Sequence, residues 1–243
     1  MRILHLSDLH LCSSPDAIIY GVNPYENLMR AIRKIQNISG IDLCVITGDI
    51  SNDGSQESYE LADIALSTLP FPVYVMKGNH DSSLLLMHHY EKMDYSPRFT
   101  FSGIDFIALD TIAIAEDGTN RSRGVISEQE LHRFREWIEE GENKKIVLMH
   151  HPSILTDSWL DCRILQNREE FNDFVHASDR ILAVLSGHNH FATEAIIGGC
   201  LFSVAPSVST SFDKDLSPFE EAYTPGFNLV SIRQNISIET YYF

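Results

Sequence analysis

The sequence has few basic residues, few cysteines and no long apolar run. Lysine and arginine number 18 against 34 aspartate and glutamate residues, so the formal net charge at pH 7 is −16. Proteins hold nucleic-acid backbones through clustered Lys and Arg side chains, and this shortage argues against a nucleic-acid polymer as partner. The 4 cysteines are scattered without a CxxC pair, which indicates reduced thiols in a cytoplasmic protein.

Signals for a membrane or for export are also missing. Every apolar run is interrupted well before the ~20 residues that a membrane-spanning helix needs. His5 and Asp8 lie where a secretion signal would need an unbroken apolar stretch. We therefore expect no membrane partner and a cytoplasmic location.

The residues that are present describe a soluble globular chain. Of 243 residues, 44% are hydrophobic and 21% are charged, and this length is sufficient to bury a full core. No compositional break, repeat or linker divides the chain, which predicts a single domain over residues 1–243. The 11 histidines are a large stock of side chains suited to metal binding or proton transfer.

Short apolar runs of strand character alternate with amphipathic stretches through most of the chain. Two helix starts are well marked: Asn23 precedes Pro24, and Ser127 to Glu130 form a capping box. Strands that alternate with helices predict βαβ units and an α/β fold. The predicted buried strands are 3–6, 43–46, 73–76, 106–109, 146–149 and 181–185.

The C-terminal part changes character, because strand-like runs there are joined by short turns. Gly198-Gly199 favours a hairpin, and the Ser-, Pro- and acid-rich segment 207–226 is predicted to be a long loop. Two packed sheets, or one sheet with an antiparallel flank, would both fit this pattern. The predicted strands are 191–197, 200–204, 227–232 and 236–242.

Polar side chains follow five of the predicted strands at the point where each strand ends. In open α/β sheets the carboxyl ends of the strands form the ligand crevice, so we expect these side chains to converge. The segments concerned are Asp8-Leu9-His10, Gly48-Asp49, Gly78-Asn79-His80-Asp81, His150-His151 and Gly187-His188-Asn189-His190.

The candidate ligands are too many for one four-coordinate ion. They comprise two carboxylates, one amide oxygen and five imidazoles, namely Asp8, Asp49, Asn79, His10, His80, His150, His188 and His190. Such a set suits two ions that share a bridging carboxylate, as in binuclear hydrolases whose metals lie about 3.5–4 Å apart.

These motifs, in this order, resemble those of the calcineurin-like metallophosphoesterase family. The resemblance covers every metal-binding block. It implies a four-layer α/β/β/α sandwich of two mixed sheets and a metal-dependent phosphoric diester hydrolase.

The resemblance also implies a role for each residue. By similarity, the first metal is held by Asp8, His10, Asp49 and His190, and the second by Asp49, Asn79, His150 and His188. His80 matches the family's catalytic histidine, which gives a proton or hydrogen bond to the leaving oxygen, while Asp81 orients it. A water shared by the two cations supplies the hydroxide that attacks phosphorus. Mn and Fe are the expected metals, and Zn or Co also suit mixed oxygen and nitrogen ligands.

Within the family, the chain is most similar to bacterial class III cyclic-nucleotide phosphodiesterases and related glycerophosphodiesterases. This implies a small phosphodiester substrate such as 3′,5′-cyclic AMP, with a glycerophosphodiester or another small phosphoester as the alternative. A non-catalytic scaffold is the remote alternative, and a homo-oligomer is left open. Segments 153–167 and 207–226 are expected to wall the site.

The remaining polar residues have less specific interpretations. His151 follows a predicted ligand and precedes Pro152, so it is a candidate for substrate binding, with a supporting or structural role as the alternative. His5 alternates with apolar neighbours and is expected in the core. Asp53 is expected to be a turn residue.

Overall fold

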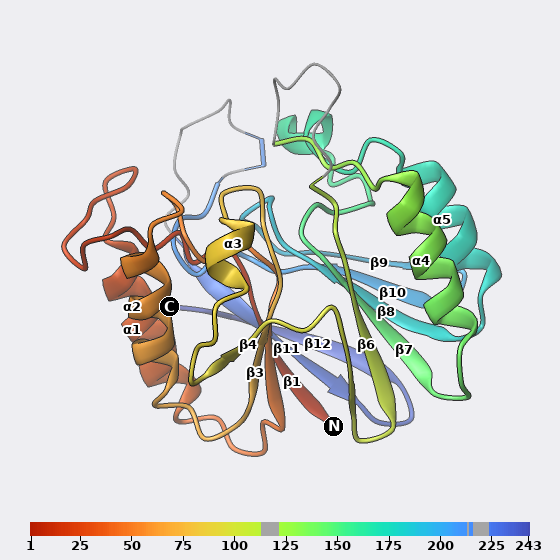
Figure 1. Cartoon of the computed structure of the whole chain (residues 1–243), viewed down its shortest axis with the longest axis horizontal. Helices are drawn as coiled ribbons and strands as arrows, with labels where there is room; N and C mark the ends of the chain where they lie inside the picture. Colours follow the sequence, from red (N-terminus) through yellow and green to blue (C-terminus); the bar gives the residue numbers. More distant parts are fainter. Residues whose placement is uncertain (113–121, 213, 216–223) are drawn as a thin grey trace.

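The computed structural model describes residues 1–112, 122–212, 214–215 and 224–243. Figure 1 shows the elements in chain order. They are β1 (Arg2–Leu6), α1 (Pro24–Ile35), β2 (Leu43–Ile46), α2 (Gln56–Leu66), β3 (Val73–Val75), α3 (Ser83–Leu86), β4 (Met93–Asp94), β5 (Arg98–Phe101), β6 (Ile104–Leu109), α4 (Glu128–Glu139), β7 (Lys144–Met149), the 3₁₀ helix η1 (Trp159–Cys162), α5 (Arg168–Ala177), β8 (Ile181–Ser186), β9 (Thr193–Ile197), β10 (Cys200–Val204), β11 (Gly226–Ile232) and β12 (Ile236–Tyr242).

The strands form two mixed sheets, and this decides between the two arrangements that the sequence left open. The first sheet has the order β12-β11-β1-β2-β3-β4, and the second has the order β5-β6-β7-β8-β10-β9. Strands β1 to β4 are parallel, β11 pairs with β1 in antiparallel fashion, and β12 pairs antiparallel with β11 at the sheet edge. In the second sheet β6, β7, β8 and β10 are parallel, and β5 and β9 are antiparallel edges.

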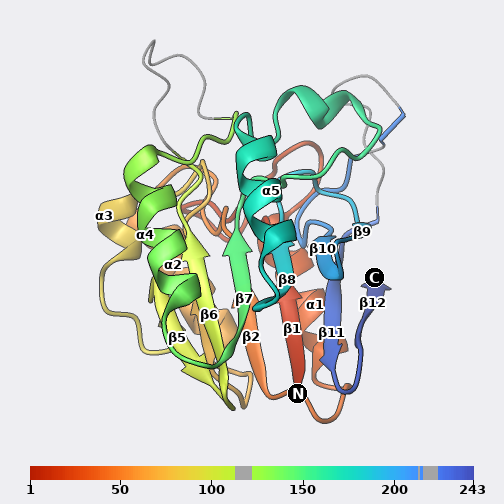
Figure 2. The same cartoon turned by 90° about the vertical axis from the view of Figure 1, so that its right-hand side faces the viewer.

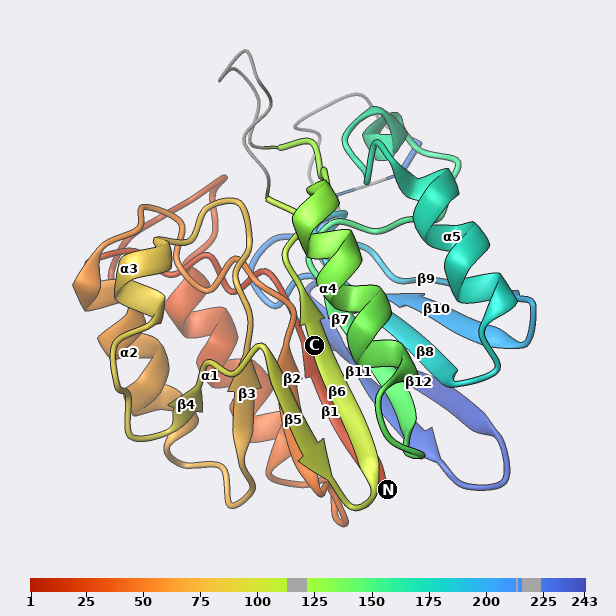
Figure 3. The same ribbon diagram turned by 45° about the vertical axis from the view of Figure 1, so that its right-hand side comes forward.

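Helices cover the outer face of each sheet, so the predicted four-layer sandwich is confirmed. In Figures 2 and 3, α4 and α5 lie over the second sheet, and α1 and α2 lie behind the first. Three apolar clusters fill the layers. The middle one joins the two sheets through residues such as Ile3, Val45, Ile146 and Leu185, all fully buried. The extent of the domain, residues 1–243, stays a prediction.

The two predicted helix starts have different outcomes. The Asn23 side chain accepts the N–H of Glu26, with Pro24 in the first turn, as expected. Ser127 likewise accepts the N–H of Glu130. The capping box is wrong, however, because the Glu130 carboxylate accepts the N–H of Asp110 instead. This bond ties the start of α4 to the end of β6.

The segment 207–226 is only partly a loop on the surface. Residues 207–211 are buried, and Ser207 bonds back to the turn after β1 through the carbonyl of Asp8. Residues 213 and 216–223 lie outside the described part of the chain.

Within the described residues, no helix combines the length and the apolar character that crossing a bilayer requires.

Candidate metal centre

Five of the predicted ligands have left-handed backbone conformations, which are rare for residues other than glycine. Their φ angles are 56° for Asp8, 47° for His10, 51° for Asp49, 72° for His188 and 62° for His190. Each such residue costs about 1–2 kcal/mol, so the surrounding bonds must hold it in place. Backbone bonds join these turns: the N–H of Asp8 donates to Gly48 and that of His10 to Asp49.

The first group of ligand atoms contains Asp8, His10 and His190. The Nε2 atoms of the two histidines lie 3.1 Å apart, and the Asp8 Oδ1 atom is 3.4 Å from that of His190. His190 Nδ1 lies 2.7 Å from the carbonyl of Thr210, which can only accept. Nδ1 is therefore a protonated nitrogen that donates to Thr210, and Nε2 faces the group.

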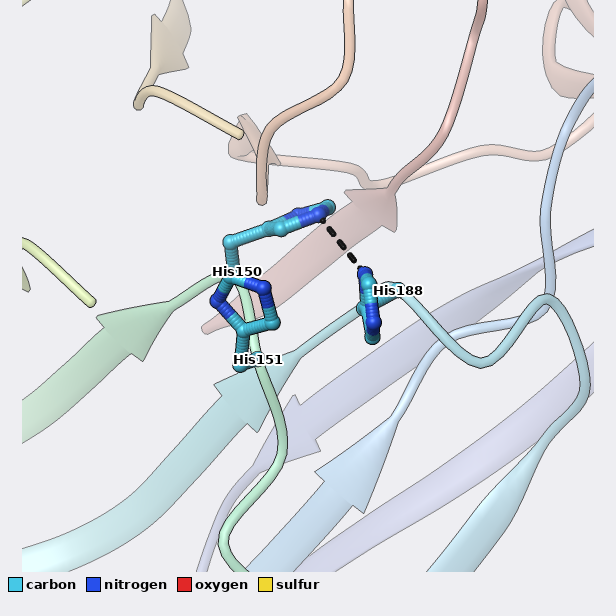
Figure 4. A group of neighbouring side chains, drawn as sticks. All are labelled: His150, His151 and His188. Atoms are coloured by element: carbon cyan, nitrogen blue, oxygen red, sulfur yellow. Dashed lines mark hydrogen bonds between the residues drawn. The ribbon is translucent and has the colours of Figure 1, made fainter. Parts of the chain in front are cut away.

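The second group contains Asn79, His150 and His188. Figure 4 shows the rings of His150 and His188 pointing toward one another, with His150 Nε2 3.2 Å from His188 Nδ1. The Asn79 amide oxygen is 2.9 Å from the same Nε2 atom. His150 Nδ1 donates to the carbonyl of Thr47 at 2.8 Å. Against the effect of burial, Asp49 and Asp8 raise the pKa of His150 to about 9, so a metal ion that binds Nε2 displaces a proton.

Asp49 lies between the two groups. Its Oδ2 atom is 3.7 Å from His10 Nε2 and 3.3 Å from His150 Nε2, one residue from each group. Its Oδ1 atom accepts the backbone N–H of His80 at 2.8 Å. Asp49 therefore lies within reach of both groups, and the family resemblance implies that such a carboxylate is shared between two ions.

The charge states in this centre suit cations. Burial alone would raise the pKa of Asp8, but His190 and His150 beside it hold that pKa well below its usual range. Burial lowers the pKa of His10 to about 4, and burial together with the charge of His150 lowers that of His188 to about 3. The centre thus offers an ionised Asp8 carboxylate and the neutral imidazoles of His10 and His188, donors that borderline divalent metals prefer.

One buried atom supports this reading independently. Asp8 is fully buried, and its Oδ1 atom has no hydrogen-bond partner among the described residues. A buried ionised oxygen without a partner is costly unless it faces a cation. The donor set therefore fits the two metal ions that the family uses.

His80 is exposed at the edge of the centre, with its ring 4.9 Å from that of His10. Its Nδ1 atom lies 3.1 Å from the backbone carbonyl of Asn52. The expectation that Asp81 orients His80 is wrong. Asp81 is buried and accepts the N–H groups of Gly78 and Ser51, at 2.8 and 3.0 Å. It therefore joins the turns after β2 and β3, and the Asn52 carbonyl orients His80.

A further correction concerns His151, which is fully buried rather than facing a substrate. Its Nδ1 atom lies 2.8 Å from the Thr111 hydroxyl, and its ring centroid is 4.3 Å from that of His188 (Figure 4). Gly124 packs so closely that an added Cβ would lie 2.5 Å from the Cβ of His151. His151 thus packs against the ring of His188 on its buried side and holds that ring in place.

A cleft opens directly over this centre. Candidate ligands form its floor, and the sequence reasoning missed part of its wall. Trp159 and Arg163 belong to segment 153–167, and Phe212 belongs to segment 207–226, both of which were expected there, whereas Ile19 and Tyr20 were not singled out. The available signal was the short apolar run Ile18-Ile19-Tyr20 in the loop between β1 and α1. The described residues of the wall are Ile19, Tyr20, Asn52, Ser122, Trp159, Leu160, Arg163, Thr210 and Phe212.

Comparison with known proteins identifies the family of this centre. The family model for calcineurin-like phosphoesterases matches residues 1–192. The chain belongs to the calcineurin-like phosphoesterase family. As in that family, it is a metal-dependent phosphoesterase.

Relatives of this calcineurin-like phosphoesterase have related names. A probable cyclic nucleotide phosphodiesterase of Coxiella burnetii is 31% identical over 92% of this chain and 90% of its own length. A probable glycerophosphodiester phosphodiesterase, GpdQ, of Arcobacter nitrofigilis is 27% identical over 89% of this chain and 81% of its own. The crystal structure of a dimetal phosphatase from Danio rerio has the same fold, with a TM-score of 0.72 at 14% identity, covering 98% and 95% of the two chains.

Proposed function

We propose that this phosphoesterase hydrolyses small phosphodiesters at a binuclear metal centre, with a 3′,5′-cyclic nucleotide such as cyclic AMP as substrate. The observation that carries the proposal is the place of Asp49 Oδ2, which lies within 3.7 Å of one ligand group and 3.3 Å of the other. The name of the Coxiella relative supports the choice of substrate.

Seven side chains would hold the ions. Asp8, His10, Asp49 and His190 would hold one, and Asp49, Asn79, His150 and His188 the other. Two bound cations would offset the charge of the phosphate and would lower the pKa of a bound water molecule to near neutral, so that it supplies hydroxide. Mn and Fe are the proposed metals, and the mixed oxygen and nitrogen donors also accept Zn or Co.

His80 would move the proton at the leaving oxygen. The carbonyl of Asn52 accepts from Nδ1, so this atom keeps its proton and the ring is held in one orientation. The other nitrogen, Nε2, would then donate its proton to the leaving alkoxide from the imidazolium form of the ring, which leaves His80 neutral with its proton on Nδ1. Assistance of this kind contributes about 10²–10⁴-fold to a reaction rate.

A glycerophosphodiester is the second candidate substrate, because the Arcobacter relative is named for that activity. The non-catalytic scaffold is disfavoured, since the seven candidate ligands and His80 gather in one place. Among the residues that the structure describes, four groups have metal-binding geometry, and each of them involves the centre itself.

Steady-state kinetics on purified protein loaded with Mn²⁺ tests the proposal. The substrates are bis(p-nitrophenyl) phosphate, 3′,5′-cyclic AMP, 2′,3′-cyclic AMP and glycerophosphoethanolamine. We expect metal-stimulated turnover and the highest kcat/KM for the 3′,5′-cyclic nucleotide. His150→Ala should abolish turnover, whereas His132→Ala, an exposed histidine on α4, is the matched control. Absence of metal-stimulated turnover of every diester would refute the proposal.

A further inference from the structure

The cleft over the metal centre has two chemically different ends. The floor carries imidazoles, carboxylates and the Asn79 amide, whereas the far wall is made of apolar and aromatic side chains. A phosphoryl group belongs at the first end. The second end must therefore contact whatever the phosphate carries.

Three aromatic rings meet at the second end. The Phe212 ring lies parallel to His190, with centroids 4.5 Å apart and an interplanar angle of 11°. The rings of Trp159 and Tyr20 stand edge-on to Phe212, with centroids 5.8 and 6.3 Å away. We call these three rings the aromatic corner. One of them, Phe212, stacks directly on the candidate metal ligand His190.

The Trp159 side of the aromatic corner is built onto the same turn as the ligands. The Asn189 amide, between His188 and His190, donates to the Thr156 hydroxyl at 3.3 Å. That hydroxyl donates to Asp161 at 2.7 Å. Asp161 and Ser158 form the capping box of η1, the helix that carries Trp159.

The Phe212 side is fixed to the same turn. The Thr210 carbonyl accepts from His190 Nδ1, and the Ser211 hydroxyl donates to the His190 carbonyl at 3.2 Å. Both walls are therefore positioned by the residues that place the phosphate. This preorganisation lowers the cost of ordering a bound group.

Arg163 adds hydrogen-bond donors to the aromatic corner. Its guanidinium carbon lies 5.9 Å from the centroid of the Trp159 ring, and the side chain lines the cleft. Within the described ranges, no carboxylate forms an ion pair with it, in a protein that carries a net charge of −16. A guanidinium held over an aromatic ring suits the ring nitrogens and carbonyl oxygens of a heterocycle.

We propose that the aromatic corner and Arg163 bind the planar base of a nucleoside phosphodiester, and that Trp159 determines the preference for nucleotides over glycerol diesters. This inference rests on the proposed phosphodiesterase function. The alcohol groups of a glycerophosphodiester are flexible and polar, and they gain little binding energy from contact with apolar rings. A base stacks on aromatic side chains whatever its identity.

The first test compares substrate selectivity. It measures the ratio of kcat/KM for 3′,5′-cyclic AMP to that for glycerophosphoethanolamine in the Mn²⁺-loaded protein. Trp159→Ala should lower this ratio by about 10- to 100-fold, the size expected for one stacked base, mainly through KM. Trp159→Phe should restore most of it. Trp137→Ala, which changes the other tryptophan, on α4, is the control and should leave the ratio as it is.

The second test reads binding without turnover. In Trp137→Phe the only tryptophan left is Trp159, so its fluorescence reports the aromatic corner. Saturating adenosine 5′-phosphate should change this emission, and glycerol 3-phosphate should not. Equal responses to both ligands, or an unchanged ratio in Trp159→Ala, would overturn the inference. If no diester is hydrolysed, the proposed function fails, and the fluorescence result still decides whether the corner binds a base.

Discussion

Gly78→Ala tests the bridging position of Asp49 by sterics alone. A Cβ at residue 78 would lie 2.1 Å from Asp49 Oδ1 and 2.2 Å from the Asp49 nitrogen. Gly78 has an ordinary φ, so alanine brings no backbone strain of its own. The clash can be relieved only by moving Asp49 or the turn after β3. Overpacking of this kind costs about 1–3 kcal/mol, which is roughly a 2–10 °C fall in Tm for a chain of this size.

The displaced carboxylate should weaken both ions together. Loss of correct ligand orientation typically lowers metal affinity by about 10–100-fold, so metal per chain and kcat/KM should fall in parallel. The assay is elemental analysis after dialysis at limiting Mn²⁺, with thermal unfolding alongside. Gly103→Ala is the matched control: φ is +79° and no atom lies within 4 Å of an added Cβ. It should cost about 1–2 kcal/mol through backbone strain without losing metal. A Gly78→Ala protein with two ions per chain and normal turnover would refute the bridging geometry.

Three further predictions concern single side chains. His80→Ala should keep both metals but lower kcat for alkyl diesters by about 10²–10⁴-fold, with a smaller effect on bis(p-nitrophenyl) phosphate, whose leaving group needs no proton; loss of metal would contradict the role of His80. Asp49→Ala should lose metal at both sites, and full occupancy by elemental analysis would contradict the shared carboxylate. His5 is buried, and burial lowers its pKa to about 3 against the opposing charge of Asp8. In the unfolded protein His5 therefore binds a proton below about pH 6.5, whereas in the folded protein it stays neutral down to about pH 3. Through this histidine the free energy of unfolding is unaffected above pH 6.5 and falls as the pH drops from 6.5 toward 3, by up to about 1.4 kcal/mol per pH unit. Urea unfolding of the metal-free protein should show this slope reduced in His5→Gln, and an equal slope in both proteins would show that His5 does not contribute.

The candidate ligands could be predicted from the sequence because each directly follows a buried strand. The end of a buried strand such as residues 43–46 is marked in the sequence by the change from apolar to polar residues. Parallel strands then bring their carboxyl ends to one edge of the sheet. The same logic missed β5 and β4. In β5, Arg98 and Thr100 alternate with half-buried Phe99 and Phe101 on a sheet edge, and this weak pattern is closed by a turn at Ser102-Gly103.

The roles of Asp81 and His151 could not be predicted from their neighbours along the chain. Asp81 is adjacent to His80 in sequence, yet its carboxylate turns toward backbone N–H groups of the turn after β2. His151 is adjacent to His150, yet it pairs with Thr111, from the turn after β6. Both partners are distant in sequence, so only the folded structure brings them together. Of the aromatic corner, Trp159 and Phe212 lie in the two segments that were expected to wall the site, whereas Tyr20 was missed.

The origin of the ligands in both sheets also bears on when the protein acquires its metals. Asp8, His10, Asp49 and Asn79 follow strands of the first sheet, whereas the ligands after β7 and β8 belong to the second. Neither sheet alone carries all the residues proposed for either ion, so on this proposal a nascent chain cannot capture metal tightly before its halves have docked. Ions that bind only the finished sandwich stabilise it by their full binding free energy. The supply of metal would then set the lifetime of this protein as well as its activity.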